Sequence, residues 1–321
     1  MKTIQTLVFL LMWGTVNLFA NPLKIKGDFK PTIQEFVLPF HLVSRLIIVE
    51  AKIDSQSGYF ILDTGAPDLL MNRQYFKRKG KNLPFIEMNG QSVMSTQVTI
   101  NFQLGKTKAK NRTVSALDLS ALEQTTKLPI MGIIGFQQLK KYELLFDYEK
   151  KTICFFRLNR KGERLSSSFY PQLSPIIKIP FRWKGHLPVI PIKQGITELY
   201  FGIDSGAGIN LIDRKKEHFL TENEPNVRLV KLLSLGKKSI NTQRKVIENG
   251  TIGFYALLPM KTLACHLRAI NNHLAGKKID GIIGYEFLSQ QKVAINFKLK
   301  RVSLWSKSNG IQQVYTMKKP Q

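Results

Sequence analysis

Cysteine is scarce in this chain, because only Cys154 and Cys265 occur among its 321 residues. Two cysteines permit one disulfide at most, which excludes a small fold held together by a disulfide framework. The two residues occupy non-equivalent places in the two halves of the chain, and cysteine is among the residue types most readily buried. A pair of buried free thiols is therefore favoured, while a single bridge stays open.

Motifs for metal, phosphate and serine-nucleophile chemistry are also missing. Cys265-His266 and His273 lack the spacing of a metal site, and the other three histidines are isolated, so structural or surface roles are favoured for them. Gly105-Lys106-Thr107 resembles the end of a phosphate loop, but Ile100 stands where a glycine is required, which favours a solvated turn. No Gly-x-Ser-x-Gly sequence occurs. We therefore expect neither a metal nor a cofactor.

Long apolar runs are absent except near the N-terminus. There, Met1-Lys2-Thr3 precedes an apolar run over residues 7–19, which is too short to span a membrane comfortably. Together with Ala20-Asn21-Pro22 the run predicts a signal peptide over residues 1–20, and therefore export to the periplasm, the cell envelope or the medium. Leu18 is larger than the residue expected three positions before a cleavage site, so an uncleaved N-terminal anchor stays open.

Acidic residues are few, and the net charge is 48 − 22 = +26. Such a charge attracts anionic partners, which include acidic peptides and an anionic envelope surface. The lysines and arginines lie in small scattered groups, for example at residues 77–81, 157–164 and 298–301, and not in one stripe. This pattern argues against a specific nucleic-acid groove.

One acidic segment occurs twice, as Tyr59-Phe60-Ile61-Leu62-Asp63-Thr64-Gly65-Ala66 and as Tyr200-Phe201-Gly202-Ile203-Asp204-Ser205-Gly206-Ala207. In each copy an apolar run predicts a buried strand that ends at an aspartate. The glycine two positions later permits a sharp turn and a close approach of another backbone. Each half of the chain therefore directs one carboxylate outward from the end of a strand.

A second segment is repeated as well, at residues 132–139 and 281–288, where Gly-Ile-Ile-Gly is followed by an aromatic residue and by a pattern that indicates one or two helical turns. Its last glycine lies 135 − 63 = 72 residues after Asp63 in the first copy and 284 − 204 = 80 residues after Asp204 in the second. The repeat indicates two lobes, each of roughly a hundred residues or more, in which an acidic segment is followed by a glycine segment.

The four segments resemble the motifs of the pepsin-like and retropepsin-like aspartic proteases, and the resemblance covers about residues 35–306. It implies an all-β, two-lobed acid protease fold in which each lobe is a small closed β-barrel with a short helix. The implied divisions are a signal peptide (1–20), an N-terminal extension (21–34), an N-terminal lobe (35–157), a linker (158–174), a C-terminal lobe (175–306) and a tail (307–321).

In these families two facing carboxylates share one proton, and together they provide the base and the acid that peptide hydrolysis requires. The resemblance implies that Asp63 and Asp204 are this catalytic pair. The alternative is a structural role, in which both aspartates only stabilise turns. The implied loop-support residues are Thr64, Gly65, Ser205 and Gly206, and the implied bracing residues are Ile133, Ile134, Gly135, Ile282, Ile283 and Gly284.

Asn89-Gly90 is the strongest short hairpin signal in the chain and is our candidate for the tip of a substrate-covering flap. No tyrosine occurs between Tyr75 and Tyr142, so the flap tyrosine of the pepsin branch has no counterpart. A shorter flap of the retropepsin kind is therefore expected.

The sequence thus predicts an exported, monomeric aspartic endopeptidase that needs no cofactor and acts on peptides or unfolded proteins, with an acidic preference left open. Two alternatives remain. One is a catalytically silent pepsin-fold protein that binds peptides or inhibits other enzymes, and the other is a basic envelope protein that binds polyanions. The intact Asp-Thr-Gly and Asp-Ser-Gly triplets count against the first alternative.

Overall fold

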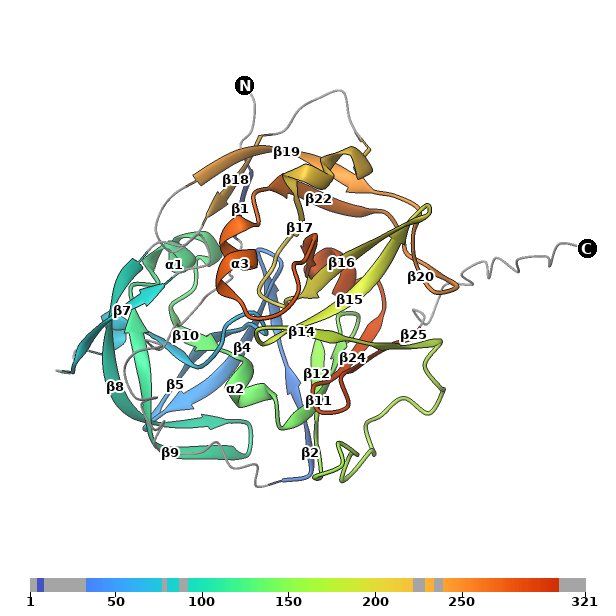
Figure 1. Ribbon diagram of the computed structural model, residues 1–321. Coiled ribbons are helices and arrows are strands. Elements are labelled where there is room, and N and C mark those ends of the chain that lie inside the picture. The colour runs from blue at the N-terminus through green and yellow to red at the C-terminus, as the bar shows by residue number, and fades with distance from the viewer. Residues whose placement is uncertain are drawn as a thin grey trace, which may run out of the picture.

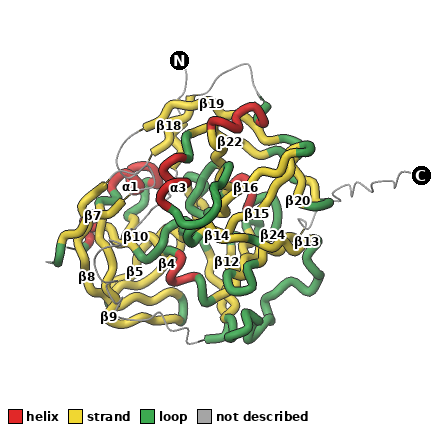
Figure 2. The backbone as a smooth tube through the Cα atoms, in the orientation of Figure 1, coloured by secondary structure: helices red, strands yellow, loops and turns green. Residues whose placement is uncertain are grey.

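Figure 1 shows the computed structural model of the chain, which describes residues 5–8, 33–76, 80–86, 92–221, 229–233 and 239–305. Strands dominate these residues (Figure 2), and the longest α-helix among them, α1 (Ser120–Thr126), has seven residues. The prediction of a mainly-β protein is therefore confirmed. None of the helices in these ranges is long and apolar enough to cross a membrane. Of the predicted signal peptide only β1 (Gln5–Val8) is described, and the predicted tail lies outside the described residues.

The N-terminal half of the chain (residues 33–157) forms an eight-stranded sheet. In spatial order its strands are β3 (His41–Val43), β4 (Leu46–Ile53), β5 (Gln56–Leu62), β10 (Ile130–Ile134), β6 (Leu70–Asn72), β9 (Thr107–Leu117), β8 (Ser92–Leu104) and β7 (Asn82–Ile86). β4 also pairs with β8, where Lys52 lies opposite Gln103 and Ile53 opposite Phe102. This extra pairing closes six strands into a ring. Phe102 packs edge to face on Phe60 within its core, with the ring centroids 5.9 Å apart.

The C-terminal half (residues 175–305) repeats this strand plan in an eleven-stranded sheet, to which it contributes every strand except β1 (Gln5–Val8). In spatial order its strands are β1, β18 (Leu229–Leu233), β19 (Ser239–Ile247), β22 (Met260–Cys265), β17 (Asn210–Asp213), β23 (Gly281–Ile283), β16 (Thr197–Ile203), β15 (Leu187–Gln194), β20 (Gly250–Ile252) and β21 (Tyr255–Ala256), with β14 (Arg182–Lys184) also on β15. β20 follows β19 directly in the chain and pairs with β15, where Gln194 lies opposite Gly250. The sheet therefore curls back on itself as the first one does.

A third sheet of six strands joins the two halves. Its strands in spatial order are β13 (Ile177–Pro180), β25 (Arg301–Trp305), β24 (Lys292–Asn296), β11 (Tyr142–Asp147), β12 (Thr152–Arg157) and β2 (Glu35–Pro39). Each half contributes three of them, and β11 and β24 pair antiparallel at the centre, with Leu145 opposite Ala294. The two halves therefore share a continuous set of backbone hydrogen bonds.

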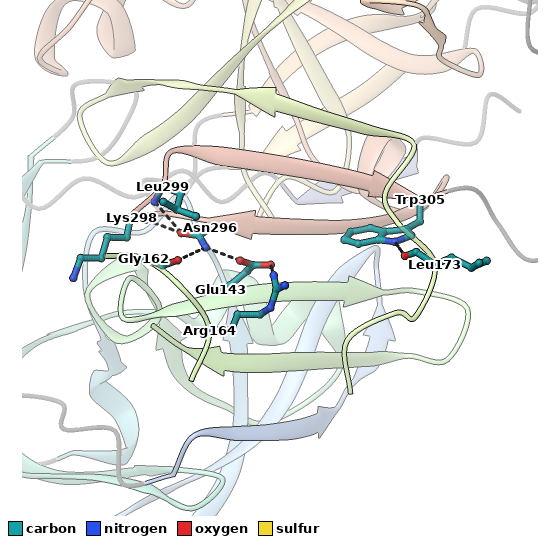
Figure 3. A network of polar contacts seen from close by, with 8 residues as sticks. All are labelled: Glu143, Gly162, Arg164, Leu173, Asn296, Lys298, Leu299 and Trp305. Carbon is teal, nitrogen blue, oxygen red and sulfur yellow. Dashed lines mark hydrogen bonds and ion pairs between the residues drawn. The ribbon is translucent and has the colours of Figure 1, made fainter. Parts of the chain in front are cut away.

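A buried polar network crosses this shared sheet (Figure 3). The Glu143 carboxylate is 2% exposed and accepts hydrogen bonds from Asn296 Nδ2 at 2.5 Å and from Arg164 Nη1 at 2.8 Å. A buried carboxylate is tolerated only when it is paired and hydrogen-bonded, and both conditions hold here. Trp305 Nε1 donates to the Leu173 carbonyl at 2.8 Å. The segment predicted as a linker is thus fastened to the shared sheet near both of its ends.

Short helices follow the two repeated glycine segments, as the sequence predicts. α2 (Phe136–Leu139) begins after Gly135, and α4 (Tyr285–Leu288) begins after Gly284. No sequence pattern predicts α1, α3 (Arg268–His273), or the 3-10 helices η1 (Arg73–Tyr75) and η2 (Arg214–Phe219). These segments are no longer than two turns, so their sequences carry too little periodicity to identify them.

The tip of the predicted flap, Asn89-Gly90, lies outside the described residues. β7 and β8 on either side of it pair antiparallel, with Ile86 opposite Ser92. The hairpin predicted at this place is therefore confirmed, while the role of its tip stays a prediction.

Both cysteines are free and buried, which confirms the favoured interpretation. Burial raises the pKa of Cys154 to about 11 and that of Cys265 to about 12. Both thiols therefore remain protonated, and hence poorly nucleophilic, at neutral pH.

Candidate active site

Each half of the chain presents one aspartate directly after a buried strand. β5 ends one residue before Asp63 and β16 ends one residue before Asp204. Most of the last four residues of both strands are apolar, β-branched or aromatic, and such residues favour a buried strand. Both aspartates are consequently 0% exposed. We call residues 63–66 and 204–207 the acidic loops, and Asp63 with Asp204 the aspartate pair.

The predicted bracing segments, Ile133-Ile134-Gly135 and Ile282-Ile283-Gly284, lie against the acidic loops. β10 and β23 pair parallel with β5 and β16. The backbone N–H of Asp63 donates to the carbonyl of Ile134 at 3.0 Å, and that of Asp204 donates to the carbonyl of Ile283 at 2.9 Å. Each aspartate is therefore fixed at its backbone by the brace of its own half.

Glycine is required in both braces because the acidic loop passes too close for a side chain. A Cβ on Gly135 would lie 2.7 Å from the Ala66 carbonyl oxygen, and one on Gly284 would lie 2.1 Å from the Ala207 carbonyl oxygen. The N–H of the residue after each glycine donates to that same oxygen at 2.8 Å. The loop and the brace thus form one hydrogen-bonded unit in each half.

Reciprocal hydrogen bonds join the two acidic loops across the boundary between the halves. Thr64 N–H donates to Ser205 Oγ at 3.0 Å, and Ser205 N–H donates to Thr64 Oγ1 at 2.9 Å. The Ser205 hydroxyl in turn donates to the Leu62 carbonyl at 3.0 Å. All three contacts are buried, so the hydroxyls of both residues hold the two loops in a fixed relative position.

The two carboxyl groups face each other over the two glycines. A Cβ on Gly65 would lie 2.4 Å from Asp204 Oδ2, and one on Gly206 would lie 2.4 Å from Asp63 Cγ. Gly65 N–H donates to both Oδ1 atoms, at 2.7 Å to Asp63 and 3.0 Å to Asp204. Ala66 N–H adds a bond to Asp63 Oδ1 at 3.0 Å, and Gly206 N–H adds one to Asp204 Oδ1 at 2.8 Å. Each carboxylate is therefore oriented by two backbone donors.

Burial and proximity make it unfavourable to ionise both members of the pair. Burial raises the pKa of Asp63, and the neighbouring Asp204 carboxylate raises it further. Burial also raises the pKa of Asp204, to about 6, despite its hydrogen bonds. The Oδ2 atoms are buried and, among the described residues, have no partner outside the pair. One proton held between the two groups therefore satisfies both oxygens and removes most of the repulsion.

Two basic side chains that contact the opposite half have no site role predicted from the sequence, which favours a structural or surface role for His186 as for the other isolated histidines. Arg45 reaches from the N-terminal half to Glu286, with an Nη1 to Oε1 distance of 2.6 Å, and lies 5.4 Å from the centroid of the Tyr285 ring. His186 reaches from the C-terminal half to the Gly65 carbonyl, at 2.6 Å from Nε2. The signal that identifies them is their position, since each stands 18 residues before an aspartate (63 − 45 and 204 − 186).

The structure thus brings together the predicted aspartate pair, the loop-support residues and both braces, whereas the predicted flap tip is not described. Within the described residues, no group of three or more His, Cys, Asp or Glu side chains is placed to hold a metal ion. An ionised carboxylate beside a protonated one can remove a proton from a bound water and deliver another proton to a substrate atom. Neither a comparison with protein-family models nor a search of curated proteins finds a match for this chain.

The close approach of the glycines predicts a large difference between neighbouring substitutions. Gly65→Ala and Gly206→Ala place a methyl group on the opposite carboxylate, so each should lower the free energy of unfolding by about 1–3 kcal/mol or more. Gly202→Ala is the matched control, because its Cβ would meet only ordinary contacts of 3.5 Å or longer. Urea denaturation measures all three, and equal stability of Gly65→Ala and Gly202→Ala would contradict the facing arrangement.

Proposed function

We propose that the protein is an aspartic endopeptidase in which Asp63 and Asp204 hydrolyse peptide bonds. The proposal extends to the fold, which we assign to the two-lobed pepsin-like type with one ring of strands in each lobe. The observation that carries it is the aspartate pair itself: two fully buried carboxylates from equivalent loops, hydrogen-bonded to the same glycine N–H. Structural aspartates in turns do not need to face each other in this way.

In the proposed mechanism the ionised carboxylate takes a proton from a water molecule, and the water oxygen bonds to the peptide carbonyl carbon. The protonated carboxyl gives its proton to the carbonyl oxygen, which produces a neutral tetrahedral intermediate. The intermediate collapses when the carbon–nitrogen bond breaks: the leaving nitrogen accepts a proton from one carboxyl of the pair, and a hydroxyl group of the intermediate returns a proton to the other carboxylate as its carbonyl re-forms. The products are a carboxylic acid and an amine, and the pair regains its starting protonation.

Substrate entry requires movement, because both aspartates are 0% exposed. Peptides and unfolded proteins are the proposed substrates, since an extended chain can enter a cleft between two lobes. The charge of +26 supports an anionic substrate or envelope surface by general attraction. Export, suggested by the N-terminal apolar run, and a monomeric state complete the proposal. A polyanion-binding protein is the competing function that the same charge supports.

Replacing either member of the pair should nearly abolish hydrolysis. We expect Asp63→Asn and Asp204→Asn each to lower kcat/KM for an unfolded protein substrate by roughly 100- to 10,000-fold, the usual contribution of general acid–base catalysis. The double variant should be little worse than either single variant, because the two groups act as one unit. Rates measured by mass spectrometry of the released peptides test this expectation.

Folding can be monitored separately in the same variants. A carboxyl group whose pKa is raised by folding stabilises the fold below its unfolded pKa, and that stabilisation is lost as pH rises through the folded value. The wild type should therefore lose stability as pH rises through about 6, and Asp204→Asn should lose less.

Substantial hydrolysis by either folded single variant would contradict the mechanism, and a wild type that only binds polyanions would favour the competing function.

The pH dependence of kcat/KM should be bell-shaped, with its optimum at a pH above the usual aspartate pKa of about 4. Hydrolysis requires one proton on the pair, so it falls at low pH when a second proton binds and at high pH when the shared proton leaves. Burial raises both pKa values, that of Asp204 to about 6, and repulsion from Asp204 raises the pKa of Asp63 further. We therefore expect the optimum at about pH 6 or above, measured with a fluorogenic peptide. An optimum below the usual aspartate pKa of about 4 would contradict the raised values.

A further inference from the structure

Two equivalent hairpin turns reach across the boundary between the halves to the opposite acidic site. One turn joins β3 to β4 and carries Arg45, and the other joins β14 to β15 and carries His186. Arg45 meets the side chain of Glu286 just beyond the brace of the C-terminal half. His186 meets the acidic loop of the N-terminal half and lies against Phe136 of α2, with the ring centroids 5.8 Å apart.

The contact made by His186 leads directly to a carboxylate. Its Nε2 lies 2.6 Å from the Gly65 carbonyl oxygen. Since that partner can only accept, Nε2 carries the hydrogen and donates it. The Gly65 carbonyl and the Ala66 N–H belong to the same peptide unit, and that N–H donates to Asp63 Oδ1 at 3.0 Å. One peptide plane therefore connects the imidazole of one half with the carboxyl group of the other.

We propose that His186 is a positioning residue for the aspartate pair, which fixes the Gly65–Ala66 peptide and polarises it toward Asp63. The proposal rests on the peptidase function proposed above. A hydrogen bond to a carbonyl oxygen makes the N–H of the same peptide a stronger donor, because linked hydrogen bonds polarise one another. His186 thereby stabilises the ionised form of Asp63 from a distance and does not touch the substrate.

A neutral imidazole suits this role better than a cation. Burial lowers the pKa of His186, although the hydrogen bond to Gly65 opposes the shift. A neutral donor orients the loop without adding a full charge beside the shared proton. At the equivalent position the cation is compensated, since Arg45 forms an ion pair with Glu286.

The other charged side chains on the hairpin of His186 donate hydrogen bonds to backbone carbonyls and not to His186. On its own hairpin, Arg182 donates to two backbone carbonyls. Lys184 on the same strand donates to three carbonyls within and after α3. α2 presents the uncharged ring of Phe136. The acidic loop of the N-terminal half presents the Gly65 carbonyl, with the aspartate pair behind it, so the pair is the charge that His186 influences.

Two substitutions at this position separate donation from packing. His186→Gln keeps a neutral N–H donor, and His186→Leu keeps an apolar contact with Phe136 but removes the donor. We expect His186→Leu to lower kcat by roughly 10- to 100-fold with little change in KM, the factor expected for a lost buried hydrogen bond. His186→Gln should restore most of that loss. The exposed His218, as His218→Leu, is the control for removal of a histidine elsewhere.

Carbon NMR titration of the labelled Asp63 carboxyl provides a readout that does not depend on hydrolysis. The titration of the pair should move to higher pH in His186→Leu and stay near the wild-type position in His186→Gln and His218→Leu. A His186→Leu titration that overlays the wild type would overturn the proposal, as would a glutamine variant no better than leucine. If the shift occurs but the wild type cleaves no peptide, the positioning role stands and the peptidase function fails.

Discussion

The reciprocal hydrogen bonds between Thr64 and Ser205 hold the two halves together at the point where two buried carboxylates repel each other. Neither half can build the site alone, since each hydroxyl accepts from the backbone of the other half. Four further hydrogen bonds from the N–H groups of Gly65, Ala66 and Gly206 replace the hydrogen bonds to water that the carboxylates lose on burial. Hydrogen bonds to charged groups contribute about 1.5–3 kcal/mol each, so this donor set makes a buried acidic pair tolerable. The shared proton removes most of the remaining repulsion.

The two halves repeat one backbone plan with different chemistry around the aspartate pair. Phe136 and His186 border one side with uncharged rings, whereas Tyr285 borders the other side beside the Arg45 and Glu286 ion pair. Carboxyl groups in unlike surroundings have unlike proton affinities, which is the condition for one to act as base while the other acts as acid. The repeat supplies the geometry of facing groups, and in the proposed mechanism its divergence would assign one carboxyl the role of base and the other that of acid. The shared six-stranded sheet contains strands from both halves and therefore holds the halves in a fixed relative position.

The sequence predicted the strands that end at the two aspartates, the hairpin of β7 and β8, the short helices after the braces and the residues that the structure gathers around the pair, because these depend on local pattern and on an internal repeat. The direction of the pKa shifts could not be predicted, since it depends on burial that only the packed structure reveals. His186 and Arg45 also escaped detection. An isolated basic residue on a hairpin carries no motif, and its partner lies across the boundary between the halves, far away in sequence. Comparing equivalent positions before each aspartate would have drawn attention to both.

The most direct test of the central claim is the affinity for a peptide whose scissile bond is replaced by a tetrahedral carbon bearing a hydroxyl group. Calorimetry should compare it with the same peptide lacking that hydroxyl, since in the proposed mechanism only the hydroxyl would occupy the position of the attacking water between Asp63 and Asp204. If the pair stabilises the tetrahedral intermediate, the hydroxyl should tighten binding at least roughly 100-fold in the wild type. The gain should vanish in Asp204→Asn. Equal affinities of the two peptides for the wild-type protein would contradict the account.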